Sequence, residues 1–231
     1  MKLCAITDGL ALPELDPNAG PRQPAERRPG LIELAGGWAA GGVDYIQVRE
    51  KQLEPSALRV LVGRFVAAVH PSESPATATC NKTKILVNGP ALIANEAGAD
   101  GVHLPGGFSA PAINHARHTF AQREAGTTSP LISVSCHYLD EVVRACDLGV
   151  DLILFAPVFG KLLGPGTTLP GVGLKALAAA CRAAGAVPVL ALGGITAENA
   201  SQCVETGAAG VAGIRLFTSG DWQSLRDVRV G

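Results

Sequence analysis

Eight short apolar segments recur along the chain, and turn signals and stretches of helical spacing separate most of them. Most are apolar on both faces, as parallel strands covered by helices must be. Alternating strands and helices with short connections predict a parallel sheet, and eight units predict closure into a barrel; an open doubly wound sheet is the alternative. The expected strands are Lys2–Thr7, Tyr45–Arg49, Lys84–Asn88, Gly101–Leu104, Leu131–Ser135, Leu152–Pro157, Val187–Leu192 and Gly210–Leu216.

Helices are expected between these strands, so the whole chain, residues 1–231, is predicted to be one α/β domain, a (β/α)8 TIM barrel. Gly41-Gly42 is a good C-terminal cap for the first helix, and Thr196 is a plausible N-cap for the last. The expected helices are Leu31–Ala40, Pro55–Val69, Ala91–Ala97, Asp140–Leu148, Leu174–Ala184 and Ala197–Thr206.

Four similar loops, each with a glycine among small residues, join a helix to the next strand at 41–45, 97–101, 148–152 and 206–210. They should lie on the floor of the barrel and serve stability. Three other segments look irregular: Pro13–Pro29, Pro71–Thr83 and Gly160–Gly173. The last follows the sixth strand on the active face, where a lid is favoured over a linker.

Composition excludes several classes of function. The net charge is −1 and basic residues form no stripe, which argues against nucleic-acid binding. The apolar runs are too short to cross a bilayer, and Asp8 comes too early for a signal peptide, so a soluble cytoplasmic protein is expected. The six cysteines show no metal-site or C-x-x-C spacing and should be small buried residues.

The second strand carries polar residues at its end, where barrel strands converge on a mouth. Gln47, Arg49 and Lys51 are spaced two apart and should share one face. Two cations and an amide there could hold a phosphate or diphosphate. A solvated strand end is the alternative, but an unpaired amide such as Gln47 inside an apolar strand would be costly.

Other strand ends add candidates. Asn88 follows the third strand, and His103 lies in the fourth. Ser135 and His137 end the fifth, and His137 occupies a position suited to an acid/base catalyst. Gly193-Gly194 after the seventh strand would let backbone N–H groups approach a phosphate, with Arg215 as a fixed cation.

Taken together, these motifs resemble the thiamine phosphate synthase / thiazole tautomerase (TenI) family, in family order over nearly the whole chain. The matching segments are Ile6-Thr7-Asp8, Gln47-Val48-Arg49-Glu50-Lys51, Leu86-Val87-Asn88, Gly101-Val102-His103-Leu104, Val134-Ser135-Cys136-His137, Pro157-Val158-Phe159, Gly173-Leu174, Leu192-Gly193-Gly194-Ile195 and Gly210-Val211-Ala212.

The resemblance implies a barrel whose synthase members join hydroxymethylpyrimidine diphosphate to thiazole phosphate with Mg²⁺. It assigns the pyrimidine and diphosphate to Gln47, Arg49 and Lys51, with Asn88 beside them and Ser135 on the pyrimidine side. It assigns the thiazole phosphate to Gly193, Gly194, Ile214 and Arg215.

The chain departs from the synthase pattern at both metal-binding carboxylates. Gly89 stands where synthases have Asp, and the run Pro105–Phe108 lacks the second Asp. Without such oxygen ligands Mg²⁺ cannot neutralise a departing diphosphate. The Thr-x-Thr-Lys stretch that grips diphosphate is also replaced, although Lys161 could substitute in part, or Thr167 and Thr168 could fold back.

These departures favour a metal-independent enzyme of thiamin biosynthesis acting on a thiazole phosphate, closer to the tautomerase branch, with His137 and Lys51 as catalytic residues. A divergent synthase, with Mg²⁺, and a non-catalytic ligand-binding barrel are the alternatives. No metal ligand and no cofactor are otherwise expected. The expected partner is a small phosphorylated heterocycle, not a nucleic acid or membrane, and homodimerisation is left open.

Overall fold

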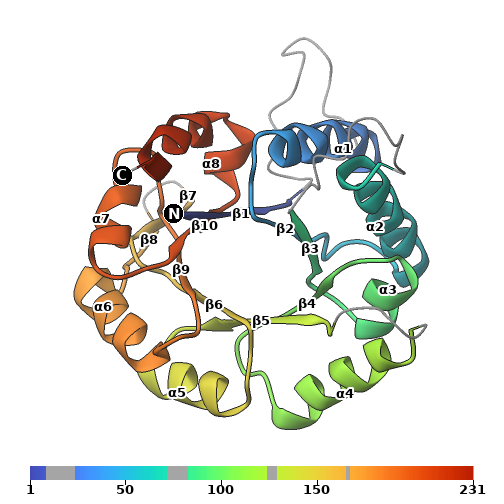
Figure 1. Cartoon of the computed structure of the whole chain (residues 1–231). Helices are drawn as coiled ribbons and strands as arrows, with labels where there is room; N and C mark the ends of the chain where they lie inside the picture. Colours follow the sequence, from blue (N-terminus) through green and yellow to red (C-terminus); the bar gives the residue numbers. More distant parts are fainter. Residues whose placement is uncertain (9–23, 72–82, 124–128, 165–166, 231) are drawn as a thin grey trace.

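Eight parallel strands close into a barrel in the order β1-β10-β9-β6-β5-β4-β3-β2, and the helices form a ring outside them (Figure 1). The computed structural model describes residues 1–8, 24–71, 83–123, 129–164 and 167–230. The (β/α)8 prediction is confirmed. The barrel strands are β1 (Lys2–Ile6), β2 (Tyr45–Val48), β3 (Lys84–Val87), β4 (Gly101–Leu104), β5 (Leu131–Cys136), β6 (Leu152–Phe155), β9 (Val189–Leu192) and β10 (Gly210–Gly213).

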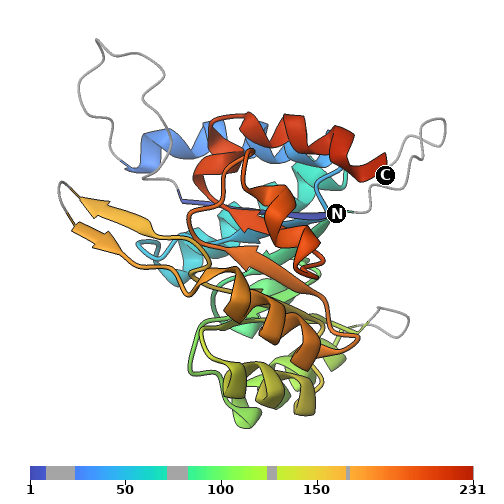
Figure 2. The ribbon, with the colours of Figure 1, turned by 90° about the vertical axis from the view of Figure 1, so that its left-hand side faces the viewer.

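The outer helices follow the strands in turn, and a short hairpin interrupts the alternation after β6. The helices are α1 (Pro24–Ala40), α2 (Pro55–Val69), α3 (Ala91–Glu96), α4 (Ala110–Ala121), α5 (Leu139–Asp147), α6 (Gly173–Ala184), α7 (Ala200–Glu205), α8 (Arg215–Thr218) and the 3-10 helix η1 (Asp221–Val230). The hairpin pairs β7 (Lys161–Gly164) with β8 (Thr167–Leu169) in antiparallel register and projects from the body of the barrel (Figure 2).

Alternate strand residues face two different cores. One set faces the helices and belongs to the larger cluster, which includes Leu3, Ile46 and Ile132. The other set fills the barrel interior with Cys4, Ile6, Leu86, Leu152, Leu154, Leu190 and Ala212. Inward-facing residues nearer the carboxyl ends of the strands are polar. The barrel interior is therefore apolar around the cluster and polar at the mouth.

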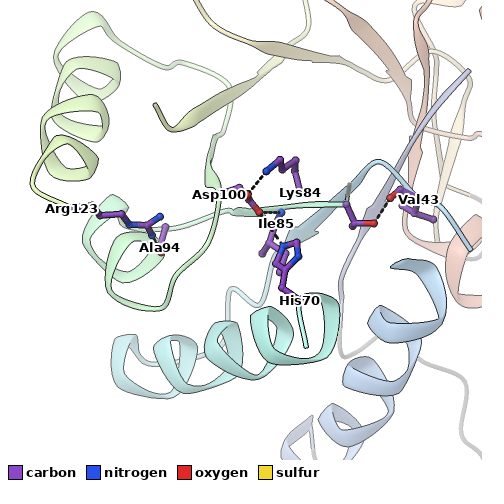
Figure 3. Close-up of polar contacts among 8 residues, drawn as sticks. Val43, His70, Lys84, Ile85, Ala94, Asp100 and Arg123 are labelled. Carbon is purple, nitrogen blue, oxygen red and sulfur yellow. Dashed lines mark hydrogen bonds and ion pairs between the residues drawn. The ribbon is translucent and has the colours of Figure 1, made fainter. Parts of the chain in front are cut away.

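On the floor of the barrel, an aspartate links two adjacent strands, β3 and β4, by hydrogen bonds. Asp100, just before β4, donates its N–H to the Ile85 carbonyl at 2.9 Å, and its Oδ2 accepts the Ile85 N–H at 2.8 Å. Figure 3 shows Asp100 also meeting Lys84, with Nζ–Oδ1 at 2.7 Å, and His70, with Nε2–Oδ2 at 3.6 Å. Asp44 and Asp151 repeat the two-bond pattern with Leu3 and Ile132. The floor loops therefore hold backbone donors that would otherwise lack partners.

Removing the Asp100 carboxylate should lower the free energy of unfolding. Asp100→Ala leaves the Ile85 N–H without its acceptor, and we expect unfolding free energy to fall by about 1–3 kcal/mol. Asp100→Asn keeps an oxygen acceptor at the same place and should lose less. Urea unfolding of both variants measures the difference, and equal losses would show that the backbone bond is not the cause.

Several predicted boundaries are wrong. The last strand ends at Gly213, not Leu216, and Arg215 begins α8. The second strand ends at Val48, and the helix expected from Leu31 begins at Pro24, inside the segment expected to be a loop. Asn199, rather than Thr196, is the N-cap residue of α7, and its Oδ1 accepts the Thr196 N–H at 2.9 Å.

Other segments could not be compared in full. The expected loops at Pro13–Pro29 and Pro71–Thr83 lie mostly outside the described residues, as does Cys80. The Gly160–Gly173 segment contains the β7–β8 hairpin, so it is not wholly irregular. Helix α4 had not been predicted. Among the described cysteines, Cys4, Cys136 and Cys203 are buried, while Cys146 and Cys181 are partly exposed.

Candidate active site

Polar side chains gather on the inner face of the barrel towards the carboxyl ends of the strands. Gln47 on β2 is 2% exposed, and its Nε2 has no hydrogen-bond partner among the described residues. Its inward direction follows from strand alternation, since Ile46 and Val48 pack against the helices. A buried amide donor without a partner is costly, and a bound ligand would supply the missing acceptor.

Arg49 follows β2 and reaches the rim. Its backbone N–H donates to Thr7 Oγ1 at 2.9 Å, and Thr7 is fully buried at the end of β1. The guanidinium lies 3.8 Å from Asp8 Oδ2, with both side chains about a third exposed. Because the backbone is anchored and the head group stays partly open, Arg49 can meet an anion at the mouth.

A row of hydrogen-bonded side chains crosses from β4 to β5 beneath the mouth. His103, 2% exposed, lies between two serines: Nδ1 is 2.8 Å from Ser133 Oγ, and Nε2 is 2.9 Å from Ser135 Oγ. Burial, with a smaller contribution from the positive charge of Arg49, lowers the pKa of His103 from 6.5 to about 3. His103 is therefore neutral at physiological pH, with Arg49 close enough to affect it.

This neutral histidine should make stability depend on pH. The unfolded chain binds a proton at His103 below pH 6.5, and the folded chain does not until about pH 3. The contribution of His103 to the free energy of unfolding is thus fully present above pH 6.5. Between pH 6.5 and about pH 3 it falls by about 1.4 kcal/mol per pH unit. Urea unfolding at neutral and mildly acid pH should show this slope in the wild type and a shallower one in His103→Gln. Equal slopes would contradict the assignment.

His137 lies one residue beyond β5, held in place at two points. Its backbone N–H donates to Glu141 Oε2 at 2.5 Å, in the first turn of α5. Its Nδ1 lies 2.7 Å from the Ala156 carbonyl oxygen. A carbonyl only accepts, so Nδ1 carries a proton, and in the neutral ring the lone pair is on Nε2. Nε2 has no hydrogen-bond partner in the described chain and lies beside Gly106, where an added Cβ would come within 2.9 Å.

The loop after β9 brings backbone close to the turn after β6. Gly193 and Gly194 have φ values of 96° and 66°, which favour glycine. An added Cβ would meet Pro157 at 2.8 Å and the Gly160 carbonyl oxygen at 2.7 Å, respectively. The Asn199 amide also donates to the Gly194 carbonyl at 3.0 Å, which fixes the loop. Next to β9 in the sheet, β10 leads through Ile214 into α8, where the N–H groups of Phe217 and Thr218 both donate to the Ile214 carbonyl oxygen at 3.1 Å.

The structure brings most of the expected site residues to one end of the barrel, since all follow or end parallel strands. They are Gln47, Arg49, Asn88, Ser135, His137, Gly193, Gly194 and Ile214. Lys51 and Arg215 are also at this end but are exposed. Lys51 lies in a turn, so strand alternation no longer places it with Gln47 and Arg49. Lys161 begins β7, and its side chain lies outside the described part of the structure.

The residues at the expected magnesium positions do not fit the ion. Gly89 faces apolar side chains, with Leu58 3.2 Å from where its Cβ would be. Phe108 is buried, with the Arg144 guanidinium 5.7 Å from its ring centre. In the described ranges no three His, Cys, Asp or Glu side chains form a group that could hold a metal ion. Magnesium bound to diphosphate needs anionic oxygens that these positions do not supply.

The row of polar side chains on β4 and β5 is only partly predictable from the sequence. The sequence predicts His103 only as one candidate among the strand ends, and the prediction does not include Ser133. The signal was the alternation of Ser133, Ser135 and His137 between apolar residues, which places all three on the inner face. Glu141 accepts the His137 backbone N–H, but in the sequence it is only an acidic residue near the start of a predicted helix.

Comparison with known proteins adds the family. Residues 23–217 match the family model described as thiamine monophosphate synthase. This chain belongs to that family. A putative thiamine-phosphate synthase of Geobacter sulfurreducens is 36% identical over 79% of this chain and 76% of its own length. A thiamine-phosphate synthase of Methanoculleus marisnigri is 36% identical over 82% of this chain and 83% of its own length.

The solved structures agree on the fold of this family member. A thiamine phosphate pyrophosphorylase from Pyrococcus furiosus superposes with a TM-score of 0.71 at 22% identity, covering 98% of this chain and 94% of the other. A 3-hexulose-6-phosphate synthase superposes with a TM-score of 0.59 at 19% identity, covering 98% and 99%. None of the helices in the described ranges is long and apolar enough to span a membrane.

Proposed function

We propose that this chain is a metal-independent enzyme of thiamin biosynthesis that tautomerises a thiazole phosphate, with His137 transferring the proton. The observation that carries the proposal is the fixed tautomer of His137. The Ala156 carbonyl holds Nδ1–H, so Nε2 is a base at the rim of the barrel. Family membership supplies the substrate class, and the unsuitable residues at the magnesium positions favour chemistry without the ion.

The chemistry asks only for a proton to leave one carbon and return to another. His137 Nε2 would accept the proton from the thiazole ring, giving an imidazolium whose Nδ1–H stays bonded to Ala156. The same nitrogen would then return the proton to the second carbon, so the substrate's composition is unchanged. Lys51 is proposed to support this step as a cation at the rim.

Binding residues are proposed for each end of the substrate. The phosphate would lie against the N–H groups of Gly193, Gly194 and Ile214, with Arg215 and Lys161 as outer cations. The heterocycle would enter the mouth between Gln47, Arg49, Asn88 and Ser135. The buried Nε2 of Gln47 supports this placement because it needs an acceptor that the described chain does not provide.

A divergent synthase is the second candidate, supported by relatives named thiamine-phosphate synthase at 36% and 34% identity. Two assays on the same preparation separate the candidates. One supplies the thiazole carboxylate phosphate tautomer with a chelator, and the other supplies hydroxymethylpyrimidine diphosphate, thiazole phosphate and Mg²⁺. We expect turnover in the first and none in the second. Thiamine phosphate formation in the second would overturn the proposal, and no turnover in either would favour a ligand-binding barrel.

Gly106→Ala tests whether the space beside the base matters. The added Cβ would come within 2.9 Å of His137 Nε2, whose ring is tied to Ala156 and cannot easily yield. We expect turnover to fall about tenfold through misplacement of the base, with thermal stability nearly unchanged. Steady-state kinetics and a melting curve measure both, and unaltered turnover would mean that substrate does not approach this side of the imidazole.

A further inference from the structure

The two hydrogen bonds in the row Ser133–His103–Ser135 run in one donor-to-acceptor direction, and burial determines which. Ser133 is fully buried, and its hydroxyl lies 2.8 Å from His103 Nδ1. No other described residue bonds to that hydroxyl. A buried hydroxyl proton without an acceptor is costly, so Ser133 donates to Nδ1. The opposite direction would leave the Ser133 proton without an acceptor.

The direction of the first hydrogen bond sets that of the second, because both involve the imidazole ring of His103. A neutral histidine has one N–H and one lone pair. Because Nδ1 accepts from Ser133, the ring proton is on Nε2, which then donates to Ser135 Oγ at 2.9 Å. Burial keeps the ring neutral, so it cannot donate at both nitrogens.

Ser135 ends the row at the mouth. It is partly exposed, unlike Ser133, and lies two residues further along the inner face of β5. Its oxygen already accepts from His103, and its own proton has no acceptor among the described side chains and carbonyls. That proton is available to whatever occupies the mouth.

We propose that His103 is a positioning residue that, with Ser133 behind it, makes the Ser135 hydroxyl a hydrogen-bond donor to an acceptor atom of the bound heterocycle. Gln47 offers a second buried donor, Nε2, on the same inner face. The mouth is therefore adapted to a ring that presents acceptors rather than donors. Only the identity of this ligand as a thiazole phosphate rests on the proposed function.

The direction can be measured without any ligand. Long-range proton–nitrogen correlation spectra of protein labelled with ¹⁵N-histidine distinguish a protonated ring nitrogen from an unprotonated one. His103 is assigned by contacts of its ring protons with the β-protons of Ser133 and Ser135. We expect a proton on Nε2 and none on Nδ1 at neutral pH. A proton on Nδ1, or on both nitrogens, would overturn the proposal whatever the enzyme's substrate is.

A second measurement tests the consequence for binding. Ser133→Ala removes the donor that fixes the tautomer, at a position that is fully buried. Calorimetric titration with thiazole carboxylate phosphate should show affinity about tenfold weaker for Ser133→Ala and for Ser135→Ala, with Ser133→Thr close to wild type. Normal affinity in Ser133→Ala alongside a loss in Ser135→Ala would contradict the relay. If wild type does not bind, the proposed substrate is wrong, and the spectra still decide the direction.

Discussion

Turnover of the thiazole phosphate should fall about 10²- to 10⁴-fold in His137→Gln, while substrate affinity stays within a few-fold of wild type. Glutamine can still donate to the Ala156 carbonyl but has no basic nitrogen to accept a proton. The loss should therefore appear in kcat rather than in KM. Single-turnover kinetics with a calorimetric binding measurement separate the two quantities.

His115→Gln is the matched control for that substitution. His115 is exposed on α4, outside the mouth, and its side chain makes no hydrogen bond with the described residues. Its kinetics should equal those of wild type. Full activity in His137→Gln would remove His137 from the chemistry. A loss confined to KM would make it a binding residue instead.

Gly101→Ala should destabilise the fold by about 3 kcal/mol, and it would do so at the floor, away from the proposed chemistry. Gly101 begins β4 and faces the next strand, where an added Cβ would lie 2.0 Å from the Leu131 carbonyl oxygen. Backbone cannot yield as a flexible side chain can, so the β4–β5 ladder must shift. Chemical unfolding measures the loss, and a cost below about 1 kcal/mol would show that the barrel adjusts.

Gly63→Ala is a control whose expected effect on stability is opposite in sign to that of Gly101→Ala. Gly63 lies inside α2, and nothing is within 4 Å of where its Cβ would be. Alanine favours helix over glycine by about 0.5–1 kcal/mol, so this variant should be slightly more stable than wild type. The pair thus separates the general effect of glycine replacement from the close strand contact at Gly101.

The barrel could be predicted because its signal is local and repeated. Each strand is a short apolar run, and four floor loops have a glycine before the strand, so even approximate boundaries gave the right count and order. The mouth followed from the fold, since parallel strands in a closed barrel must end at one rim. That is why Gln47, Arg49, Ser135 and Gly193 could be grouped although they are far apart in sequence.

The features that were missed depend on non-local contacts or on mixed composition. Helix α4 begins well, with Ser109 accepting the Ala112 N–H, but polar residues dilute its apolar spacing. The apolar run through Ile214 continues the strand pattern, yet the ladder with β1 ends at Gly213, so the chain turns into α8. The direction of the His103 row needs distances and burial, which no sequence pattern contains.

Proton exchange between the thiazole carboxylate phosphate and solvent tests the central claim most directly. The protein is treated with a chelator and incubated with the substrate in D₂O, and proton NMR follows deuterium entering carbon positions of the substrate. Proton transfer by His137 without a metal predicts incorporation that the chelator does not reduce and that His137→Gln abolishes. Exchange that begins only when Mg²⁺ is restored, or that persists in His137→Gln, would contradict it.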